Sequence, residues 1–257
     1  MAKLTTYMDI LNRASSIVIV LVQPAGPLNV GSVARLCANF GIQELRLVAP
    51  CCNPLAIGSK QMSVHGLSIL NNAIIYPDLF SALADCNNIV ACSGRIGSSD
   101  FSTYSPAESL SWLLSGPTDG CSAIVFGRED RGLSNDELSL AGRVLKLVTR
   151  CEYNSLNLSH AVAIVLYELT QTYQTSIPVK SAQINKRPAT CLELEGFIND
   201  AKNLLLKVGF LYPHTSSARM KKVRALLKRS RICGSEVALL RGMVRQLHWA
   251  TKDHHSS

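Results

Sequence analysis

The chain has 257 residues, 47% of them hydrophobic and 17% charged, which is the composition of a folded globular protein with a sizeable core. No apolar run approaches the roughly 20 residues that a membrane-spanning helix needs, and Ile17–Val22 is too short for a signal-peptide core, so we expect a cytoplasmic protein with no membrane partner. The net charge of +8 comes from residues 180–257, where 15 Lys and Arg face 5 Asp and Glu; such a basic appendage is typical of a nucleic-acid binder, with a solvated helical surface as the alternative.

From the N-terminus, Ile17–Gln23 is a continuous β-branched run, which predicts a strand buried on both faces. Pro24, Gly26 and Pro27 then require a loop, and a helix is expected from Asn29 to a C-cap at Gly41. Beyond it the patterns predict further strands at 45–48, 74–76, 88–92, 123–126 and 144–148. Helices are predicted between them at 77–86 and 106–114, with a short helix capped by Ser134 with Glu137 before the last strand. Residues 51–70 are expected to form a loop with a short helix, and residues 96–105 a polar loop.

Strands and helices thus alternate six times, which predicts an α/β domain with a mostly parallel sheet. In such sheets ligands bind beyond the carboxyl ends of the strands. Polar loops are expected at that edge, and the last of them lies in the stretch Leu147–Leu169, which is interpreted as the end of a buried strand, a polar loop and then an apolar helix. Its small polar residues, Asn154, Ser155, Asn157 and Ser159, suit either a helix cap or a ligand site.

The character of the chain changes after Gln174. Residues 175–190 are polar with two prolines and no period, so they are interpreted as a linker. Three amphipathic helices with a basic exterior follow, at Leu192–Val208, Ser216–Lys228 and Ser235–Trp249. The predicted organisation is a body at 1–174, a linker at 175–190 and a basic helical extension at 191–257.

Several common site types are absent from the sequence. There is no P-loop, no G-x-G-x-x-G after the first strand, no H-E-x-x-H and no G-x-S-x-G. The sequence has nine cysteines, an odd number, and no C-x-x-C motif. This spacing argues against a zinc site and against a disulfide framework, so reduced, buried thiols are expected.

Two polar groups in the remaining loops stand out. Asn29-x-Gly31-x-x-x-Arg35 begins the first helix; we expect Asn29 and Arg35 near the same end of it, with Gly31 allowing another backbone to approach. Arg35 is alternatively a surface residue that snorkels off the helix. Glu129 lies in the loop directly after a buried strand. There its carboxylate could pair with a cation or hold the start of a helix; alternatively, Glu129 is a solvated acid in a turn.

Three segments together carry a family resemblance: Asn29–Arg35 (NVGSVAR), Ile124–Ser134 (IVFGREDRGLS) and Ser155–Ser159 (SLNLS). They resemble the three motifs of the SpoU/TrmH branch of the SPOUT RNA ribose methyltransferases, in order. Beyond them, GFLYPH, a basic helix and Glu236–Leu247 are similar to the C-terminal extension of the TrmJ family within this branch. The resemblance covers nearly the whole chain.

The resemblance implies a fold and partners that the patterns alone do not give. It implies a deep C-terminal trefoil knot in the sheet, a homodimer with the active site at the subunit interface, and S-adenosylmethionine as methyl donor without a metal. The implied donor contacts are Cys92, Ser93, Gly94, Gly127, Leu147, Asn154, Ser155 and Leu156. Cys92 stands where Thr or Ser is expected in the family, and Gly94 where Ala is expected.

The implied reaction is 2′-O-methylation of a ribose in the tRNA anticodon loop, at nucleotide 32. By resemblance Arg35 lies beside the reacting ribose, and Asn29, Glu129, Ser155 and Asn157 position it. Because a guanidinium holds its proton tightly, we favour a role for Arg35 in orienting phosphate and stabilising the 2′-alkoxide over a role as base. The alternatives are another tRNA or rRNA site, or a non-catalytic RNA-binding protein on the same fold.

Overall fold

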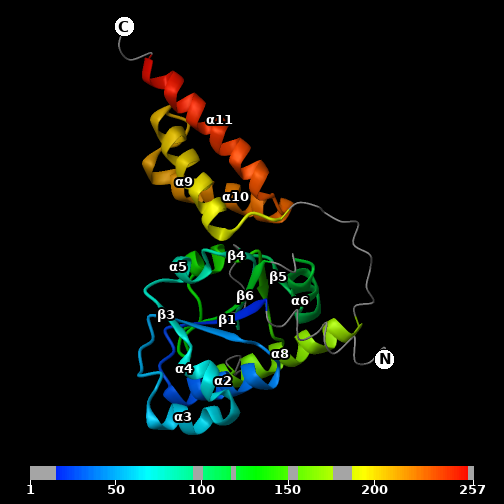
Figure 1. The fold of residues 1–257 in the computed structure, drawn as a ribbon. Helices are drawn as coiled ribbons and strands as arrows, with labels where there is room; N and C mark the ends of the chain where they lie inside the picture. Colours follow the sequence, from blue (N-terminus) through cyan, green and yellow to red (C-terminus); the bar gives the residue numbers. More distant parts are fainter. Residues whose placement is uncertain (1–15, 95–100, 117–119, 150–155, 176–186, 254–257) are drawn as a thin grey trace. The chain divides into compact units, whose positions relative to one another are not determined.

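The computed structural model describes residues 16–94, 101–116, 120–149, 156–175 and 187–253 (Figure 1). The chain divides into two compact units, Met1–Gln183 and Ile184–Ser257. Most of the predicted linker lies outside the described residues, so the division at 174 and 191 stays a prediction. Among the described residues, no helix combines the length and hydropathy that a membrane crossing requires.

Unit 1 is built around a sheet of seven described strands in which all neighbouring strands run parallel. The order across the sheet is β3-β2-β1-β6-β4-β7-β5, so the chain starts near the middle, builds one side and then crosses to the other. The predicted α/β class with a parallel sheet is confirmed. The strands are β1 (Ile17–Val22), β2 (Glu44–Val48), β3 (Ile74–Tyr76), β4 (Cys86–Cys92), β5 (Thr103–Tyr104), β6 (Cys121–Phe126) and β7 (Arg143–Leu145).

Helices cover both faces of this sheet, which is why its central strand β1 is apolar throughout. All six residues of β1 are buried. On one side its residues Ile17, Ile19 and Leu21 share a core with α2 (Pro27–Asn39), α4 (Leu67–Asn71), α6 (Pro106–Leu114) and α8 (Leu158–Thr175). The other face is covered in part by α5 (Leu79–Leu83), which contacts β2 and β3.

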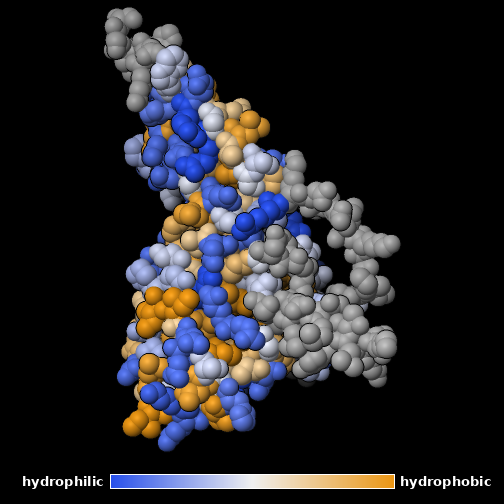
Figure 2. All heavy atoms as spheres, in the orientation of Figure 1, coloured by the Kyte–Doolittle hydropathy of each residue, from blue (hydrophilic) through white to orange (hydrophobic). Residues whose placement is uncertain are grey.

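The segment 51–70 is more helical than predicted. It contains α3 (Ile57–Ser63), a 3-10 turn at Val64–Gly66 and α4, all packed near α2. The expected close approach at Gly31 is confirmed, because a Cβ there would lie 2.1 Å from the carbonyl oxygen of Ser59 in α3. Hydrophobic side chains remain exposed over α3 and β3 (orange in Figure 2), among them Ile57 and Ile75.

Smaller corrections concern element ends. The loop predicted at 96–105 is wrong at its end, where Thr103 and Tyr104 pair with β7 as an edge strand too short to leave a pattern. β7 itself stops at Leu145 rather than 148, and Val148 is exposed. The predicted trefoil knot involves the connection from β7 to α8; residues 150–155 of that connection lie outside the described residues, so the knot stays a prediction.

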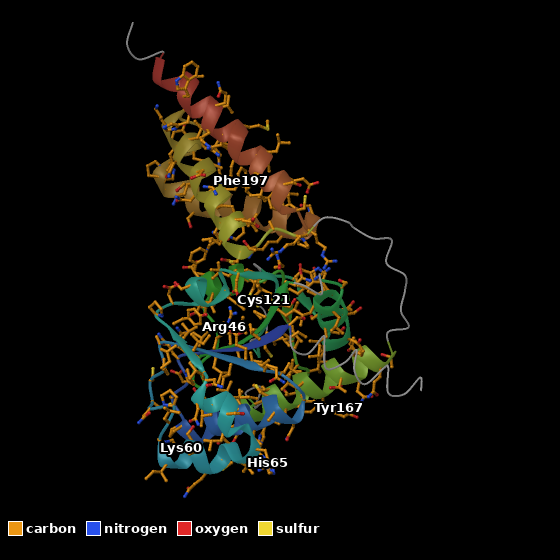
Figure 3. All side chains as sticks on the ribbon, viewed as in Figure 1. Arg46, Lys60, His65, Cys121, Tyr167 and Phe197 are labelled. Carbon is orange, nitrogen blue, oxygen red and sulfur yellow. The ribbon has the colours of Figure 1, made fainter. Side chains whose placement is uncertain are left out.

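Unit 2 consists of α9 (Cys191–Lys207), α10 (Pro213–Ser230) and α11 (Gly234–Asp253), which confirms the three predicted helices. A capping box between Thr190 and Glu193 fixes the start of α9. Phe197 of α9 (Figure 3) packs in a small apolar core with Met220 of α10 and Val237 of α11. The unit therefore has its own core.

Candidate active site

Four neighbouring strands end at the same level, and their loops carry the predicted site. In the sheet Cys92 of β4 is level with Phe126 of β6 and with Leu145 of β7. Phe126 is in turn level with Leu21 of β1. The loops after β1, β6, β4 and β7 therefore leave one edge side by side, at the carboxyl ends where the sequence predicted them.

Glu129 holds the start of α2. The N-cap residue Gly26 offers no side chain, and the carboxylate of Glu129, from a loop about a hundred residues away, instead binds the N-cap residue and the residue before it. It accepts hydrogen bonds from the backbone N–H of Ala25 (3.1 Å) and Gly26 (3.3 Å) and from Nδ2 of Asn29 (3.1 Å). An anion at a helix N-terminus is stabilised by the free N–H groups and the helix dipole. Of the three readings of Glu129, the helix start is confirmed.

The amide of Asn29 extends this contact to the last motif. Its Nδ2 donates to Glu129, and its Oδ1 accepts a hydrogen bond of 3.1 Å from Nδ2 of Asn157. Oδ1 of Asn157 in turn accepts from the backbone N–H (2.9 Å) and hydroxyl (2.8 Å) of Ser159, and so caps α8. The carboxylate at one end fixes the direction of every donor in this Glu129–Asn29–Asn157 chain. The three motifs of the sequence thus meet through side-chain contacts.

The loop after β6 is closed by contacts that the sequence did not reveal. A Cβ on Gly127 would lie 2.4 Å from the backbone of Gly132, so the chain can fold back only with glycine there. Arg128 pairs with Glu137 through two contacts of 2.9 Å and donates to Oε1 of Gln23 at 2.6 Å. Burial opposes ionisation of Glu137, but hydrogen bonds from Arg128 and the Ser134 cap hold its pKa below the usual range. The predicted Ser134–Glu137 capping box is confirmed, and Arg128 adds a second partner to it.

The residues predicted to hold the donor lie around the ends of β6, β4 and β7. Ser93 is buried, and its backbone N–H bonds to the carbonyl of Leu145 at 3.0 Å, while Gly94 is exposed. Cys92 and Leu147 pack against the apolar core. Burial raises the pKa of the Cys92 thiol to about 12, so this side chain is neutral at ordinary pH. Leu156 is half-buried just before α8. Asn154 and Ser155 lie outside the described residues.

Arg35 stands apart from the hydrogen-bond chain. It is exposed on α2, and within the described part of the chain no hydrogen bond or ion pair holds its guanidinium. Asn29 lies in the first turn of α2, and Arg35 follows six residues later, about 9 Å further along the axis. The expectation that both lie near the same end of the helix is therefore wrong.

Unit 2 presents cations and aromatic rings together. Arg219, Lys222 and Arg229 of α10 are exposed. The guanidinium of Arg219 lies 5.9 Å from the ring centre of exposed Phe210. Such pairs of exposed rings and cations suit stacking and phosphate contact with nucleic acid. Other cations of this unit are committed to ion pairs: Arg224 with Glu195 and Arg241 with Asp200.

Two family models match the chain, one for each unit. The SpoU rRNA methylase family matches residues 16–167. The C-terminal domain of the tRNA methyltransferase TrmJ matches residues 192–256. The first model spans more than half of the chain and contains all three motifs.

Individual relatives agree with these models. The chain is 33% identical over 233 residues to a tRNA (cytidine/uridine-2′-O-)-methyltransferase TrmJ from Cronobacter sakazakii, covering 89% of this chain and 94% of that protein. It is also 33% identical over 223 residues to a tRNA (cytidine-2′-O-)-methyltransferase TrmJ from Methanocaldococcus jannaschii, covering 85% and 94%. The crystal structure of TrmJ from Z. mobilis ZM4 has a TM-score of 0.77 at 29% identity, covering 90% of this chain and 98% of that one. The chain belongs to the SpoU methylase family, in the TrmJ branch.

Proposed function

We propose that the protein is an S-adenosylmethionine-dependent tRNA (ribose-2′-O-)-methyltransferase that modifies the anticodon loop, at nucleotide 32. The observation that carries the proposal is the Glu129–Asn29–Asn157 chain, in which residues 100 and 128 positions apart bond to one another. The names of the relatives, which are tRNA 2′-O-methyltransferases, support the substrate class. A cytoplasmic location is part of the same proposal.

S-adenosylmethionine supplies a methyl group on a positively charged sulfur. In the proposal Cys92, Ser93, Gly94, Gly127, Leu147 and Leu156 hold it, with Asn154 and Ser155. Their position supports this, because the strands before these loops end level with one another. Buried backbone groups suit the edges of an adenine, and the two leucines suit its faces. The neutral thiol of Cys92 places no negative charge beside the sulfonium.

The ribose hydroxyl is a poor nucleophile until it loses its proton. In the proposal the exposed guanidinium of Arg35 binds the neighbouring RNA phosphate and stabilises the developing 2′-alkoxide. Asn29, Glu129, Ser155 and Asn157 act as positioning residues for Arg35 and the substrate; Asn29 and Glu129 act at the start of α2, the helix that carries Arg35. The contacts of Glu129 with that start support this division of roles. None of these roles calls on a metal.

A homodimer with the active site at the subunit interface is part of the proposal. Arg35 lies apart from the hydrogen-bond chain of its own subunit, which suits a site completed by a second copy. His160, Ile164 and Tyr167 (Figure 3) form an exposed stripe on α8, at the spacing of one helix face. Ile164 and Tyr167 are 40% and 55% exposed, and exposed apolar residues of this size in a row suit burial by a partner.

The test of the enzymatic role is a methyl-transfer assay on unmodified tRNA, with the methylated ribose located by mass spectrometry. Arg35→Ala should lower kcat about 10²- to 10³-fold while donor affinity and thermal stability stay at wild-type values. Lys60→Ala is the matched control, because it removes an exposed cation from the neighbouring helix α3 (Figure 3). A folded wild type that methylates no tRNA ribose would refute the function, and an active Arg35→Ala would refute the role of this residue.

The test of the RNA-binding role uses unit 2. Lys222→Ala with Arg229→Ala removes two exposed cations of α10. Because each phosphate contact adds about 0.9 to the slope of log affinity against log salt, the double variant should bind tRNA more weakly and with a slope smaller by about 2. An unchanged slope would show that α10 does not contact the RNA backbone.

A further inference from the structure

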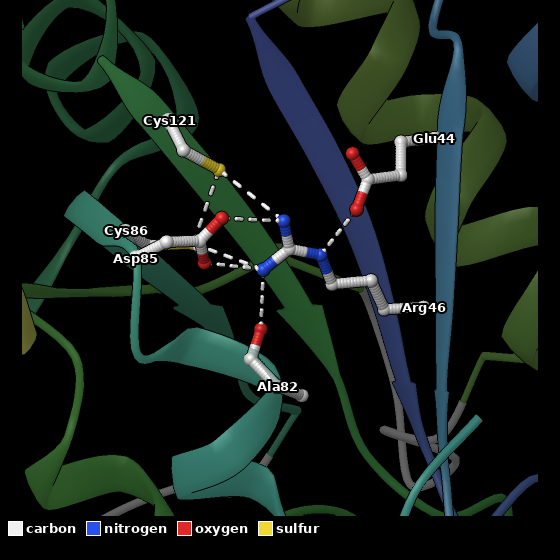
Figure 4. Close-up of polar contacts among 6 residues, drawn as sticks. All are labelled: Glu44, Arg46, Ala82, Asp85, Cys86 and Cys121. Atoms are coloured by element: carbon white, nitrogen blue, oxygen red, sulfur yellow. Dashed lines mark hydrogen bonds and ion pairs between the residues drawn. The ribbon is translucent and has the colours of Figure 1, made fainter. Parts of the chain in front are cut away.

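An arginine is buried within the sheet of unit 1, at the end opposite the proposed active site. Arg46 of β2 is only 4% exposed, and its side chain reaches across β1 toward the first residues of β4 and β6 (Figure 4). There it meets Cys86 and Cys121, the residues with which these two strands begin. The predicted buried strand at 45–48 gave no sign of this cluster, and neither did the spacing of the two cysteines.

Two carboxylates neutralise this guanidinium. Asp85 accepts from Nη1 at 2.6 Å and from Nη2 at 2.8 Å, and Glu44 accepts from Nε at 2.6 Å. The carbonyl of Ala82 takes a further contact from Nη1 at 2.6 Å. Burial alone would lower the pKa of Arg46, but the hydrogen bonds to Asp85 and Glu44 raise it, so the side chain is a permanent cation in the sheet.

The remaining sides of the guanidinium face sulfur. Nη1 lies 3.7 Å from Sγ of Cys86, and Nη2 lies 3.8 Å from Sγ of Cys121. The two sulfurs are 3.2 Å apart. A hydrogen bond from the Cys86 thiol lowers the pKa of Cys121, and the same contact, together with burial, raises the pKa of Cys86. Cys121 is partly exposed and Cys86 is fully buried. The pair therefore has one more acidic, accessible thiol and one buried thiol in contact with it.

The backbone already suits a bond between the two sulfurs. Cys86 and Cys121 are register partners on neighbouring parallel strands. Neighbouring strands are about 4.8 Å apart, which falls within the Cα separation that disulfides span, roughly 4.4–6.8 Å. A covalent bond needs the sulfurs to approach but does not need the strands to move apart or slip.

A metal site is the main alternative for this cluster. Ligand atoms of Asp85, Cys86 and Cys121 all lie within 4.8 Å of one another. Both oxygens of Asp85 are, however, engaged by Arg46, whose charge would repel a metal cation at the same place. The guanidinium already supplies the positive charge that a metal would bring.

We propose that Cys86 and Cys121 form a redox-active dithiol that peroxides convert into a disulfide. The Cys121 thiolate attacks one peroxide oxygen; the O–O bond breaks, a sulfenic acid forms, and the departing oxygen is protonated to water or alcohol. The Cys86 sulfur then attacks the Cys121 sulfur; the S–S bond forms, the S–O bond breaks, and the hydroxide leaves as water with the Cys86 proton. Two thiols lose two electrons, and the peroxide gains them.

The experiment treats the full-length protein with hydrogen peroxide at neutral pH, blocks the remaining thiols and maps disulfides by mass spectrometry without reduction. The expected product is a peptide pair joined through Cys86 and Cys121, lost on addition of dithiothreitol. Cys121 should react faster than exposed Cys51, because its sulfur contacts both the Cys86 thiol and the Arg46 guanidinium, which favour the thiolate. Cys37 is a buried internal control: burial raises the pKa of its thiol to about 12, and it should stay reduced.

Cys86→Ala separates the two steps. Without its partner, oxidised Cys121 should persist as a sulfenic acid that dimedone traps, while Cys121→Ala should give neither product. The wild-type map decides the proposal even if a variant fails to fold. Free thiols at Cys86 and Cys121 after Cys51 is oxidised would overturn it. So would stoichiometric zinc binding by the wild type that Cys121→Ala abolishes, since the pair would then hold a metal.

Discussion

Replacing Glu129 with alanine tests whether one carboxylate both starts α2 and organises the proposed site. The variant removes the acceptor for the N–H groups of Ala25 and Gly26 and for Nδ2 of Asn29. Loss of a helix cap costs typically about 1 kcal/mol, and loss of the anion at the helix N-terminus costs a further 0.3–1 kcal/mol, roughly. Because the Ala25 contact is exposed, water replaces part of what is lost. We expect Glu129→Ala to lower the free energy of unfolding by about 1–1.5 kcal/mol.

The conservative variant separates charge from geometry. Oε1 of Glu129 lies within 3.3 Å of all three donors, so the amide oxygen of Glu129→Gln can keep these contacts. The charge is lost, together with the 3.1 Å contact that Oε2 accepts from the N–H of Ala25, and we expect a cost below about 1 kcal/mol. Methyl transfer should fall strongly in the alanine variant and less in the glutamine variant, because Asn29 keeps its orientation only in the latter.

The assay is urea denaturation followed by circular dichroism, together with methyl transfer measured at a temperature where all variants are folded. Asp130→Ala is the matched control, because it removes the same charge from the next, exposed residue. An unfolding free energy of Glu129→Ala within about 0.5 kcal/mol of wild type would refute the helix-start argument. Full activity in a destabilised, folded Glu129→Ala would instead refute its positioning role.

Four further variants test three loops and faces of unit 1 and one helix of unit 2. Gly127→Ala should lower the unfolding free energy by about 2 kcal/mol or more, because its Cβ would lie 2.4 Å from backbone in the same loop, whereas Gly242→Ala, with open space around it, should stabilise by roughly 0.5–1 kcal/mol. The hydrogen bond from Arg46 lowers the pKa of Asp85, so the stability that this ion pair contributes is present in full above the ordinary aspartate pKa of about 4 and is lost as the pH falls through the lowered pKa. Asp85→Asn should therefore be less stable than wild type by about 1 kcal/mol at neutral pH. The difference between their urea midpoints should close in acid. Ile164→Asp should convert a dimer to a monomer in sedimentation equilibrium, and an unchanged mass would place the proposed interface elsewhere.

The pattern of the sequence predicted the site's location better than its contacts. β-branched runs such as Ile17–Val22 identify central strands because both of their faces must be apolar. Once the strands are parallel, the loops after them must share an edge, and the convergence of Asn29, Glu129 and Asn157 follows from that rule. Which atom bonds to which depends on side-chain direction and on loop closure, and these are set by tertiary packing.

The Arg46 cluster shows why other features were missed. A single arginine inside a short apolar strand carries no periodic signal, and its partners Asp85, Cys86 and Cys121 come from distant segments. Their meeting depends on the order of strands, because β6 enters the sheet between β1 and β4. No local pattern encodes that order, so the cluster became visible only with the sheet topology.

The residues of the proposed site also determine the local fold, which limits how their variants can be interpreted. Glu129 supplies the N-terminal partner of α2, and Asn157 caps α8, while Asn29 joins the two. A substitution in this chain changes helix starts and substrate positioning at the same time. Because no hydrogen bond or ion pair engages its guanidinium within the described residues, Arg35 is the exception. Loss of methyl transfer without loss of stability is therefore expected for Arg35 and not for the residues that position it.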